Sequence, residues 1–302
     1  NYIEYTLDYV AAGLLDEAVE LLKLSIDGDE KNVYPMALYY LGWLHYQFNK
    51  ENEGLRYFLK AAAANSDHCF PNRLEDISVL QLASEKNTSD AKASYYLGNL
   101  WYDKRQYKEA IEQWELSAAR DKNFPTVWRN LGIAYFNKLG DFKAALNAYE
   151  KAYHLNPSDA RVLMELDQLY KRLNKDPEQR LAFLEKNIPV VEQRDDLYLE
   201  RAALHNFIGA YDVAYQMLMK RKFHPWEGGE GKVSGQYVYS LVEMSKQHIH
   251  SGAFSAAIEL FEKAQEYPHN LGEGKLYGAQ ENDIFYWRAC AYEEAGNIVQ
   301  AN

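Results

Sequence analysis

The stretch YYLGNLWY at Tyr95–Tyr102 decides the fold, because a related stretch, WRNLGIAY, follows at Trp128–Tyr135. The Leu-Gly pairs of the two stretches lie 34 residues apart. A repeat of this length is typical of a pair of helices joined by a short turn. Each stretch is followed by a polar turn and then by small residues, Ala110 in the first copy and Ala144-Ala145 in the second. We therefore expect two antiparallel helices in every repeat.

These repeats resemble tetratricopeptide repeats, in which small residues lie where the two helices cross and large residues surround the crossing. Helices whose axes are about 8–10 Å apart leave no room for a branched side chain at the closest point. Gly98 and Ala110 are therefore expected to meet the rings of Trp101 and Trp114. The resemblance implies an all-α fold, a right-handed superhelical array of helical hairpins, or α-solenoid.

The period predicts how the repeats are distributed along the chain. We expect units 1–4 over residues 1–190, with a degenerate insert at 66–90, and larger units over residues 191–302 with glycine-rich loops at 223–236 and 268–280. Together they are expected to form one continuous array. In the insert, extended chain through Cys69-Phe70-Pro71 is expected to replace a first helix, ahead of a helix around Arg73 to Glu85. Since the chain starts and stops inside repeats, we expect it to be part of a longer protein.

Composition narrows the classes of function. The formal net charge of −11 opposes nonspecific binding to nucleic acid. No apolar run approaches the roughly 18 residues of a membrane span, and no secretion signal is visible, so we expect no membrane association and favour a cytoplasmic location. The only cysteines, Cys69 and Cys290, match no metal-ligand spacing, and we expect no metal and no cofactor.

A second resemblance is narrower. Four strings are similar to a bacterial family in which a β-sandwich domain related to sugar mutarotases precedes a tetratricopeptide array: HCFPNRLE at His68–Glu75, RDDL at Arg194–Leu197, RKFHPWEGGEGKV at Arg221–Val233 and NLGEGKL at Asn270–Leu276. The resemblance implies an array attached to a carbohydrate-related domain outside this chain. It does not name a reaction.

The first helix of each repeat is expected to line the concave side of the array. Positions on one face of those helices alternate aromatic and hydrogen-bonding side chains, which suits stacking of sugar rings or capture of an extended peptide. The alternative is that these tyrosine-rich faces are half-buried core. The groove candidates are Tyr39, Trp43, Tyr46, Tyr95, Asn99, Tyr102, Asp103, Arg129, Phe136, Asn137, Asp167 and Tyr170.

The glycine-rich loops supply a second set of candidates. Their spacing is one enlarged unit, so the loops at 223–236 and 268–280 should emerge on the same edge of the array. Carboxylates beside an aromatic platform would suit glycoside chemistry. Alternatively the loops brace adjacent units through Glu-Lys pairs and bound backbone, which we favour because loop glycine fixes no catalytic geometry. The loop candidates are His224, Trp226, Glu227, Glu230, Lys232 and Glu273.

No catalytic motif accompanies these features. The leading hypothesis is therefore a scaffold that binds a protein, a peptide or its own missing β-sandwich domain and has no turnover of its own. The rival is the helical part of a carbohydrate-active enzyme or carbohydrate-binding protein. Self-association through the ends of the array is a third possibility.

Overall fold

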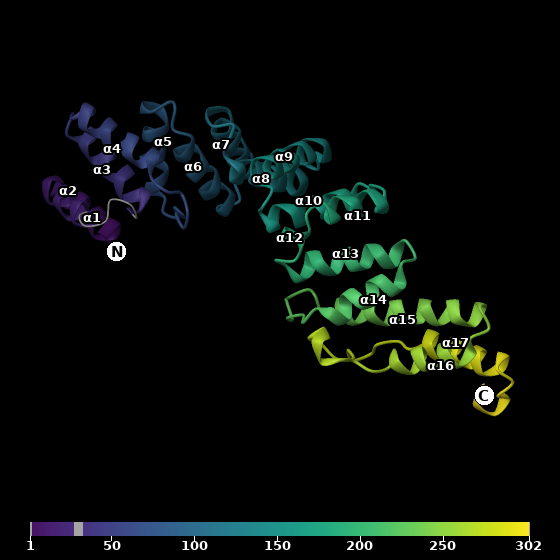
Figure 1. Cartoon of the computed structure of the whole chain (residues 1–302). Coiled ribbons are helices and arrows are strands. Elements are labelled where there is room, and N and C mark those ends of the chain that lie inside the picture. The colour runs from purple at the N-terminus through teal and green to yellow at the C-terminus, as the bar shows by residue number, and fades with distance from the viewer. Residues whose placement is uncertain (1, 27–32, 302) are drawn as a thin grey trace. The chain divides into compact units, whose positions relative to one another are not determined.

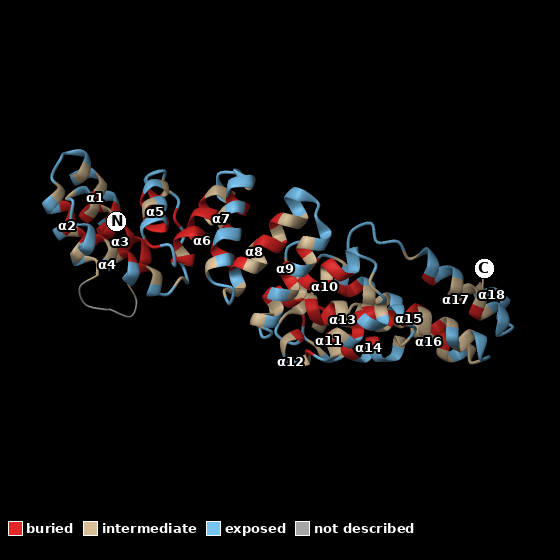
Figure 2. Cartoon of the chain, turned by 90° about the horizontal axis from the view of Figure 1, so that it is seen from above, coloured by how far each residue is buried: buried red, intermediate tan, exposed pale blue. Residues whose placement is uncertain are grey.

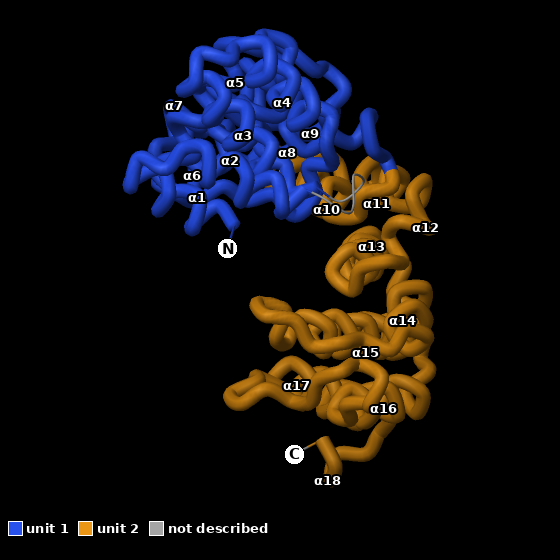
Figure 3. The backbone as a smooth tube through the Cα atoms, turned by 90° about the vertical axis from the view of Figure 1, so that its left-hand side faces the viewer, with its two compact units in different colours: residues 1–157 blue, residues 158–302 orange. Residues whose placement is uncertain are grey.

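The computed structural model describes residues 2–26 and 33–301, which form helices joined by turns and loops, without a strand among them (Figure 1). This confirms the expected all-α class built from helical hairpins. The chain divides into two compact units, residues 1–157 and 158–302 (Figure 3). The sequence pattern placed the change in repeat character at residue 190, within the second unit.

The first unit consists of hairpins whose helices pack side by side. Its helices are α1 (Tyr2–Ala11), α2 (Leu15–Leu24), α3 (Pro35–Gln47), α4 (Glu51–Ala63), α5 (Glu75–Lys86), α6 (Ala91–Asp103), α7 (Tyr107–Arg120), α8 (Pro125–Ala134) with the π-helical turn η1 (Tyr135–Leu139), and α9 (Phe142–Leu155).

The second unit continues the hairpin pattern and adds longer loops. Its helices are α10 (Ala160–Arg172), α11 (Pro177–Glu185), α12 (Ile188–Val191), α13 (Asp195–Phe207), α14 (Tyr211–Lys220), α15 (Lys232–His250), α16 (Phe254–Lys263), the 3₁₀ turn η2 (His269–Leu271), α17 (Asn282–Glu294) and α18 (Ile298–Ala301).

The hairpins share one kind of turn. The second residue after the end of the first helix has positive φ, and it is a glycine in most hairpins and Asn49, Arg105 or Asn174 in the others. The next amide then donates to a carbonyl five residues back, as from Lys50 N to His45 O at 2.9 Å. This is the Schellman arrangement, which satisfies the free carbonyls at a helix end.

One hairpin departs from this turn. After Gly140 the amide of Asp141 donates to the carbonyl of Tyr135, six residues back, because η1 takes up one additional residue. A single inserted residue is the usual origin of a π turn within a helix. The insertion makes Ala145, which is fully buried, the counterpart of Ala110 in the preceding hairpin.

Glycines occupy the helix crossings. A Cβ added at Gly98 would lie 2.3 Å from Trp114 Cδ1, and one added at Gly132 would lie 2.7 Å from Tyr149 Cδ2. The expectation that Gly98 faces Trp114 is therefore confirmed. Figure 2 shows buried residues concentrated along the helix faces that meet inside each unit.

The insert contains one helix, α5, which packs against α3 and α6. Residues 64–74 before it form no helix, and Cys69 within them is buried. Asp76 at the start of α5 accepts hydrogen bonds from Tyr40 Oη at 2.7 Å and from the amides of Asn72 and Arg73 at 2.9 and 3.0 Å. These bonds attach the non-helical segment to α3.

Candidate functional site

The candidate site in the first unit lies where α6 meets α8. Asn99 Oδ1 on α6 accepts one hydrogen bond from Trp114 Nε1 and another from Asn130 Nδ2 on α8, each 3.1 Å long. Tyr95 precedes Asn99 by one helical turn, but its ring is buried against Phe124 with ring centres 4.9 Å apart, so the prediction that Tyr95 faces a ligand is wrong. The two asparagines thus form an amide bridge between successive repeats, in which Asn130 Oδ1 accepts no hydrogen bond within the part of the chain that the structure describes.

Aromatic side chains continue this surface toward the hairpin turns. The ring of Tyr102 lies 5.1 Å from Tyr107 and 5.3 Å from Trp114, and Lys138 Nζ lies 3.9 Å from the centre of the Tyr107 ring. Aromatic faces attract cations at this distance. Phe136 packs on the ring of a neighbouring helix, whereas the predicted Asp103 and Asn137 are exposed. Arg129 is half-buried.

The structure corrects the prediction for α3. Tyr39 is completely buried, and its hydroxyl donates to Asp90 Oδ2 at 2.8 Å, so its ring cannot contact a ligand. The reason is that α5 and α6 pack on this face of α3, with Tyr39 edge-on to Tyr96. Trp43 and Tyr46 on the same helix remain half-buried, and Tyr46 stacks on a core ring.

A second correction concerns α10. Asp167 is fully buried and accepts hydrogen bonds from Arg180 Nε at 3.1 Å and Nη2 at 2.6 Å. Arg180 also donates to Glu200, so the three charges form an internal network. Burial raises the pKa of Asp167 although Arg180 opposes this. Tyr170 is buried as well, and neither residue presents its side chain to a groove.

The two glycine-rich loops contact each other in the second unit. The amide of Phe223 donates to the carbonyl of Asn270 at 2.8 Å, and Asn270 Nδ2 donates to backbone carbonyls at the end of α14, including Leu218 at 2.9 Å. Gly272 has a φ of 75°, and a Cβ there would lie 2.6 Å from Phe223 O. Only glycine permits this close approach of the two backbones.

Glu273 has a structural function in this contact. Its carboxylate accepts from the amides of Gly231 and Ser234, each at 2.8 Å, and from Ser234 Oγ at 2.9 Å. These groups begin α15, whose own N-cap, Gly231, has no side chain to offer. A negative charge at a helix N-terminus also complements the helix dipole. Glu273 thus braces adjacent repeats, because it accepts hydrogen bonds from backbone amides at the start of α15.

A pocket of about 310 Å³ opens between these loops. Of the predicted loop residues, His224, Trp226, Glu227, Glu230 and Glu273 line it, and Lys232 does not. Glu227 and Glu230 are exposed, while both oxygens of Glu273 are engaged with α15. The backbone amide of His224 donates to Asp195 Oδ2 at 2.9 Å, which ties the loop to α13. The pocket could contact a ligand through its lining residues. However, its free carboxylates, Glu227 and Glu230, are not held at a fixed separation from each other.

Comparison with known proteins identifies the repeats. A family model described as tetratricopeptide repeat matches residues 79–127 and 130–186. These two segments are similar to tetratricopeptide repeats. They include α6, α7, α9 and all of α8 except Trp128 and Arg129, so the amide bridge between Asn99 and Asn130 joins two hairpins that match the tetratricopeptide model.

Several solved structures are similar to this chain at low sequence identity. A structure of Naa15/Naa10 bound to HypK-THB is 15% identical, with a TM-score of 0.50, over 88% of this chain and 35% of that chain. The crystal structure of YrrB, a TPR protein with an unusual peptide-binding site, is 18% identical over 61% of this chain and 90% of its own, with a TM-score of 0.45. PilF of Pseudomonas aeruginosa is 17% identical over 72% and 88%, with a TM-score of 0.41.

The described residues contain neither a cluster of metal ligands nor a helix that could span a membrane. Among residues 2–26 and 33–301, no three side chains of His, Cys, Asp or Glu gather as metal ligands would. Within the same residues no helix combines the length and the apolar character needed to cross a bilayer.

The sequence did not single out Asn130, which forms the bridge to Asn99. Its counterpart in the preceding tetratricopeptide repeat is Tyr96, which is fully buried, so the period alone assigns this position to the core. The hydrogen bond between Asn130 and Asn99 becomes apparent only in the three-dimensional structure, where α8 lies beside α6.

Proposed function

We propose that this protein is a scaffold without turnover that holds an extended peptide segment of a partner protein along the α6–α8 surface. The observation that carries the proposal is the amide bridge of Asn99 and Asn130. An extended peptide backbone presents N–H and C=O groups that the backbone of the scaffold cannot pair, because helices use their own. Side-chain amides are suited to this task, since each offers both a donor and an acceptor.

The residues around the amide bridge favour a peptide as the ligand. Asn130 Oδ1 is available to accept a peptide N–H, and the half-buried ring of Tyr102 on α6 provides rigid contact area near it. The exposed Asp103 and Asn137 add polar groups at the rim, where orientation is set. The fold itself agrees, since tetratricopeptide arrays create extended binding surfaces.

The test uses a peptide selected from a phage-displayed random library on the immobilised protein. Asn130→Ala removes the acceptor but leaves Asn99 its bond to Trp114, and we expect the Kd of the peptide to rise about tenfold. The matched control is Asn147→Ala, an exposed asparagine on the outer helix α9, which should leave the Kd unchanged. An equal Kd for Asn130→Ala and the unaltered protein, both with intact helical circular dichroism, contradicts the proposal.

A carbohydrate-related role is the alternative, favoured by the loop pocket and by the narrower family resemblance. There Trp226 could stack on a sugar ring beside Glu227 and Glu230. An oligosaccharide array probed with the same protein separates the two proposals. Binding that is lost in Glu230→Gln but kept in Asn130→Ala would favour the carbohydrate role.

A further inference from the structure

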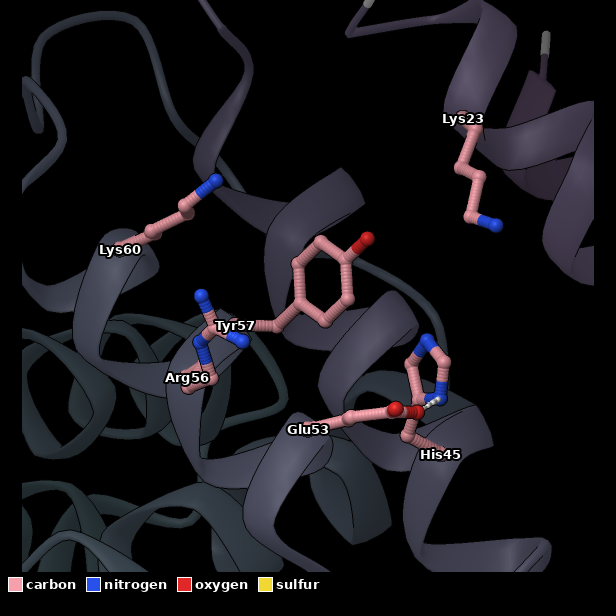
Figure 4. A pocket seen from close by; sticks show the side chains of 6 residues that line it. All are labelled: Lys23, His45, Glu53, Arg56, Tyr57 and Lys60. Atoms are coloured by element: carbon pink, nitrogen blue, oxygen red, sulfur yellow. Dashed lines mark ion pairs between the residues drawn. The ribbon is translucent and has the colours of Figure 1, made fainter. Parts of the chain in front are cut away.

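A second pocket, of about 330 Å³, lies in the first unit away from α6 and α8 (Figure 4). Four of its lining residues come from one face of α4, since their spacing of three or four residues places them in line along the helix. α2 and α3 contribute one residue each, from their last turns. The lining residues are Glu53, Arg56, Tyr57 and Lys60 of α4, Lys23 of α2 and His45 of α3.

The pocket is positively charged in a chain whose net charge is −11. Lys23, Arg56 and Lys60 are positively charged and Glu53 is negatively charged, while Lys23 Nζ lies 2.8 Å from Glu20 Oε1 in an ion pair. Arg56 and Lys60, which lie outside this ion pair, supply the two positive charges that complement a dianion. Arg56 forms no hydrogen bond or ion pair with any described residue, and the contact of Lys60 is with the ring of Tyr57, at 5.8 Å. Both side chains are exposed and able to turn toward a ligand.

His45 provides an independent observation. Its side chain is 9% exposed, its ring stacks on Tyr57 with centres 5.1 Å apart, and its Nδ1 lies 3.2 Å from Glu53 Oε2. Neither Nδ1 nor Nε2 has a hydrogen-bond partner among the described residues. Figure 4 shows Nε2 directed away from Glu53, toward the space between Tyr57 and Lys23. A buried polar atom without a partner is uncommon and calls for one, such as a bound ion.

We propose that this pocket binds a tetrahedral oxyanion, that is, a phosphoryl or sulfuryl group, between Lys23, Arg56 and Lys60, with protonated His45 as an additional donor. A carboxylate is fully paired by one arginine fork, whereas the oxygens of a tetrahedral dianion can take donors from several directions. Here the donors come from three helices. The site is independent of the peptide surface, because none of its residues lies on α6 or α8.

Equilibrium dialysis of the whole chain against radiolabelled sulfate, at constant ionic strength in sodium chloride, tests the proposal. We expect saturation at about one sulfate per chain. Arg56→Gln/Lys60→Gln should weaken binding at least tenfold. The control Lys108→Gln/Lys143→Gln removes two exposed lysines from α7 and α9 and should leave binding unchanged. Absence of saturable binding, or equal loss in the control, overturns the proposal.

Competition defines the ligand class. Inorganic phosphate and O-phosphoserine should displace the labelled sulfate, whereas acetate and glutamate at the same concentration should not. Displacement by phosphoserine better than by phosphate would indicate a phosphorylated ligand rather than a free ion, and either result supports the site. Equal displacement by glutamate would show a general anion surface and overturn the assignment to tetrahedral oxyanions.

The pH dependence tests the role of His45. Burial lowers the pKa of His45, Glu53 opposes this, and Lys50 and Lys23 lower it further, so the free site holds a neutral ring at pH 7.5. A bound dianion favours the protonated ring, and sulfate affinity should therefore rise as pH falls from 7.5 to 5.5, while sulfate itself keeps its charge. His45→Gln should abolish the rise. A flat profile in the unaltered protein contradicts the role of His45.

Discussion

At the scale of single residues, the hairpins depend on the absence of a Cβ. The nearest atoms to a Cβ added at Gly98 all belong to Trp114, which is 3% exposed. The indole cannot withdraw freely, because its Nε1 donates to Asn99 in the candidate site. The small residue at the crossing and the polar bridge on the surface are thus connected through one tryptophan.

Gly98→Ala should therefore destabilise the protein. The added Cβ would lie 2.3 Å from Trp114 Cδ1, and overpacking of this kind costs about 1–3 kcal/mol. Gly235→Ala is the control, since Gly235 is exposed within α15 and a Cβ there meets no atom within 4 Å. That substitution should increase the free energy of unfolding by about 0.5–1 kcal/mol through helix propensity. Urea unfolding followed by circular dichroism measures both, and an unchanged midpoint for Gly98→Ala would refute the steric argument.

The sequence predicts which residues share a helix face but not what covers that face. The period predicts that Tyr39, Asn99 and Asp167 lie on the same concave face of the array, yet of these three only Asn99 lies at a half-exposed boundary between repeats. Tyr39 is covered by α6, whose N-cap Asp90 accepts a hydrogen bond from its hydroxyl, and Asp167 is covered by Arg180 of α11. Asp90 lies outside the repeat that carries Tyr39, whereas Arg180 lies on the second helix of the repeat that carries Asp167, and repeat spacing alone predicts neither pairing.

At the scale of elements, a helix can depend on a cap supplied from a distant loop. α15 begins at Lys232 behind a glycine, and the acceptor for its first amides is Glu273, from the neighbouring glycine-rich loop. The similar glycine patterns of the two loops suggested that they lie together. The hydrogen bonds that Ser234 donates to Glu273 could not be predicted from the sequence, because loop lengths do not fix which carboxylate reaches the end of a helix.

Glu273→Ala should destabilise the second unit by about 1–2 kcal/mol, since it leaves the amides of Gly231 and Ser234 unpaired and removes a favourable charge from the helix N-terminus. Hydrogen exchange at the Ser234 amide should accelerate in parallel. Glu230→Ala serves as control, because Glu230 is exposed and, among the described residues, its only hydrogen bond is a 3.3 Å bond from the amide of Gly228. It should change stability by less than about 0.5 kcal/mol. Equal effects of the two substitutions would show that Glu273 is not the cap.

The turn after α8 shows that a fixed sequence period does not predict where every helix starts. A 34-residue period correctly aligns the Leu-Gly pairs, but the following helix starts one residue later than in the preceding hairpin. The π turn η1 absorbs this residue, so that Gly132 still faces Tyr149. Packing at the crossing therefore prevails over regular helical hydrogen bonding in the turn.

At the scale of the whole molecule, buried side chains gather in separate clusters. One extends from Ile3 to Ala148 within residues 1–157, and another extends from Tyr198 to Ala291 within residues 158–302. In repeat proteins each repeat contacts its neighbours, and stability is approximately the sum of repeat and interface terms. The sequence grouped repeats by their spacing, which widens after residue 190, whereas the compact units reflect contacts and divide after Pro157.

Fragments 1–157 and 158–302 should consequently fold separately, because each contains its own buried cluster. We expect each fragment to keep its helical circular dichroism and to unfold cooperatively in urea. Gly98→Ala should lower the midpoint of the first fragment and Glu273→Ala that of the second, and in the whole chain each substitution should shift only the unfolding of its own unit. Hydrogen exchange at the Ser234 amide can report the second unit in the whole chain, since Ser234 lies in the first turn of α15. If Gly98→Ala shifted that signal as strongly as it shifted the midpoint of the first fragment, the two units would unfold as one. The packing interactions that stabilise each hairpin would then have to extend across the boundary at Pro157.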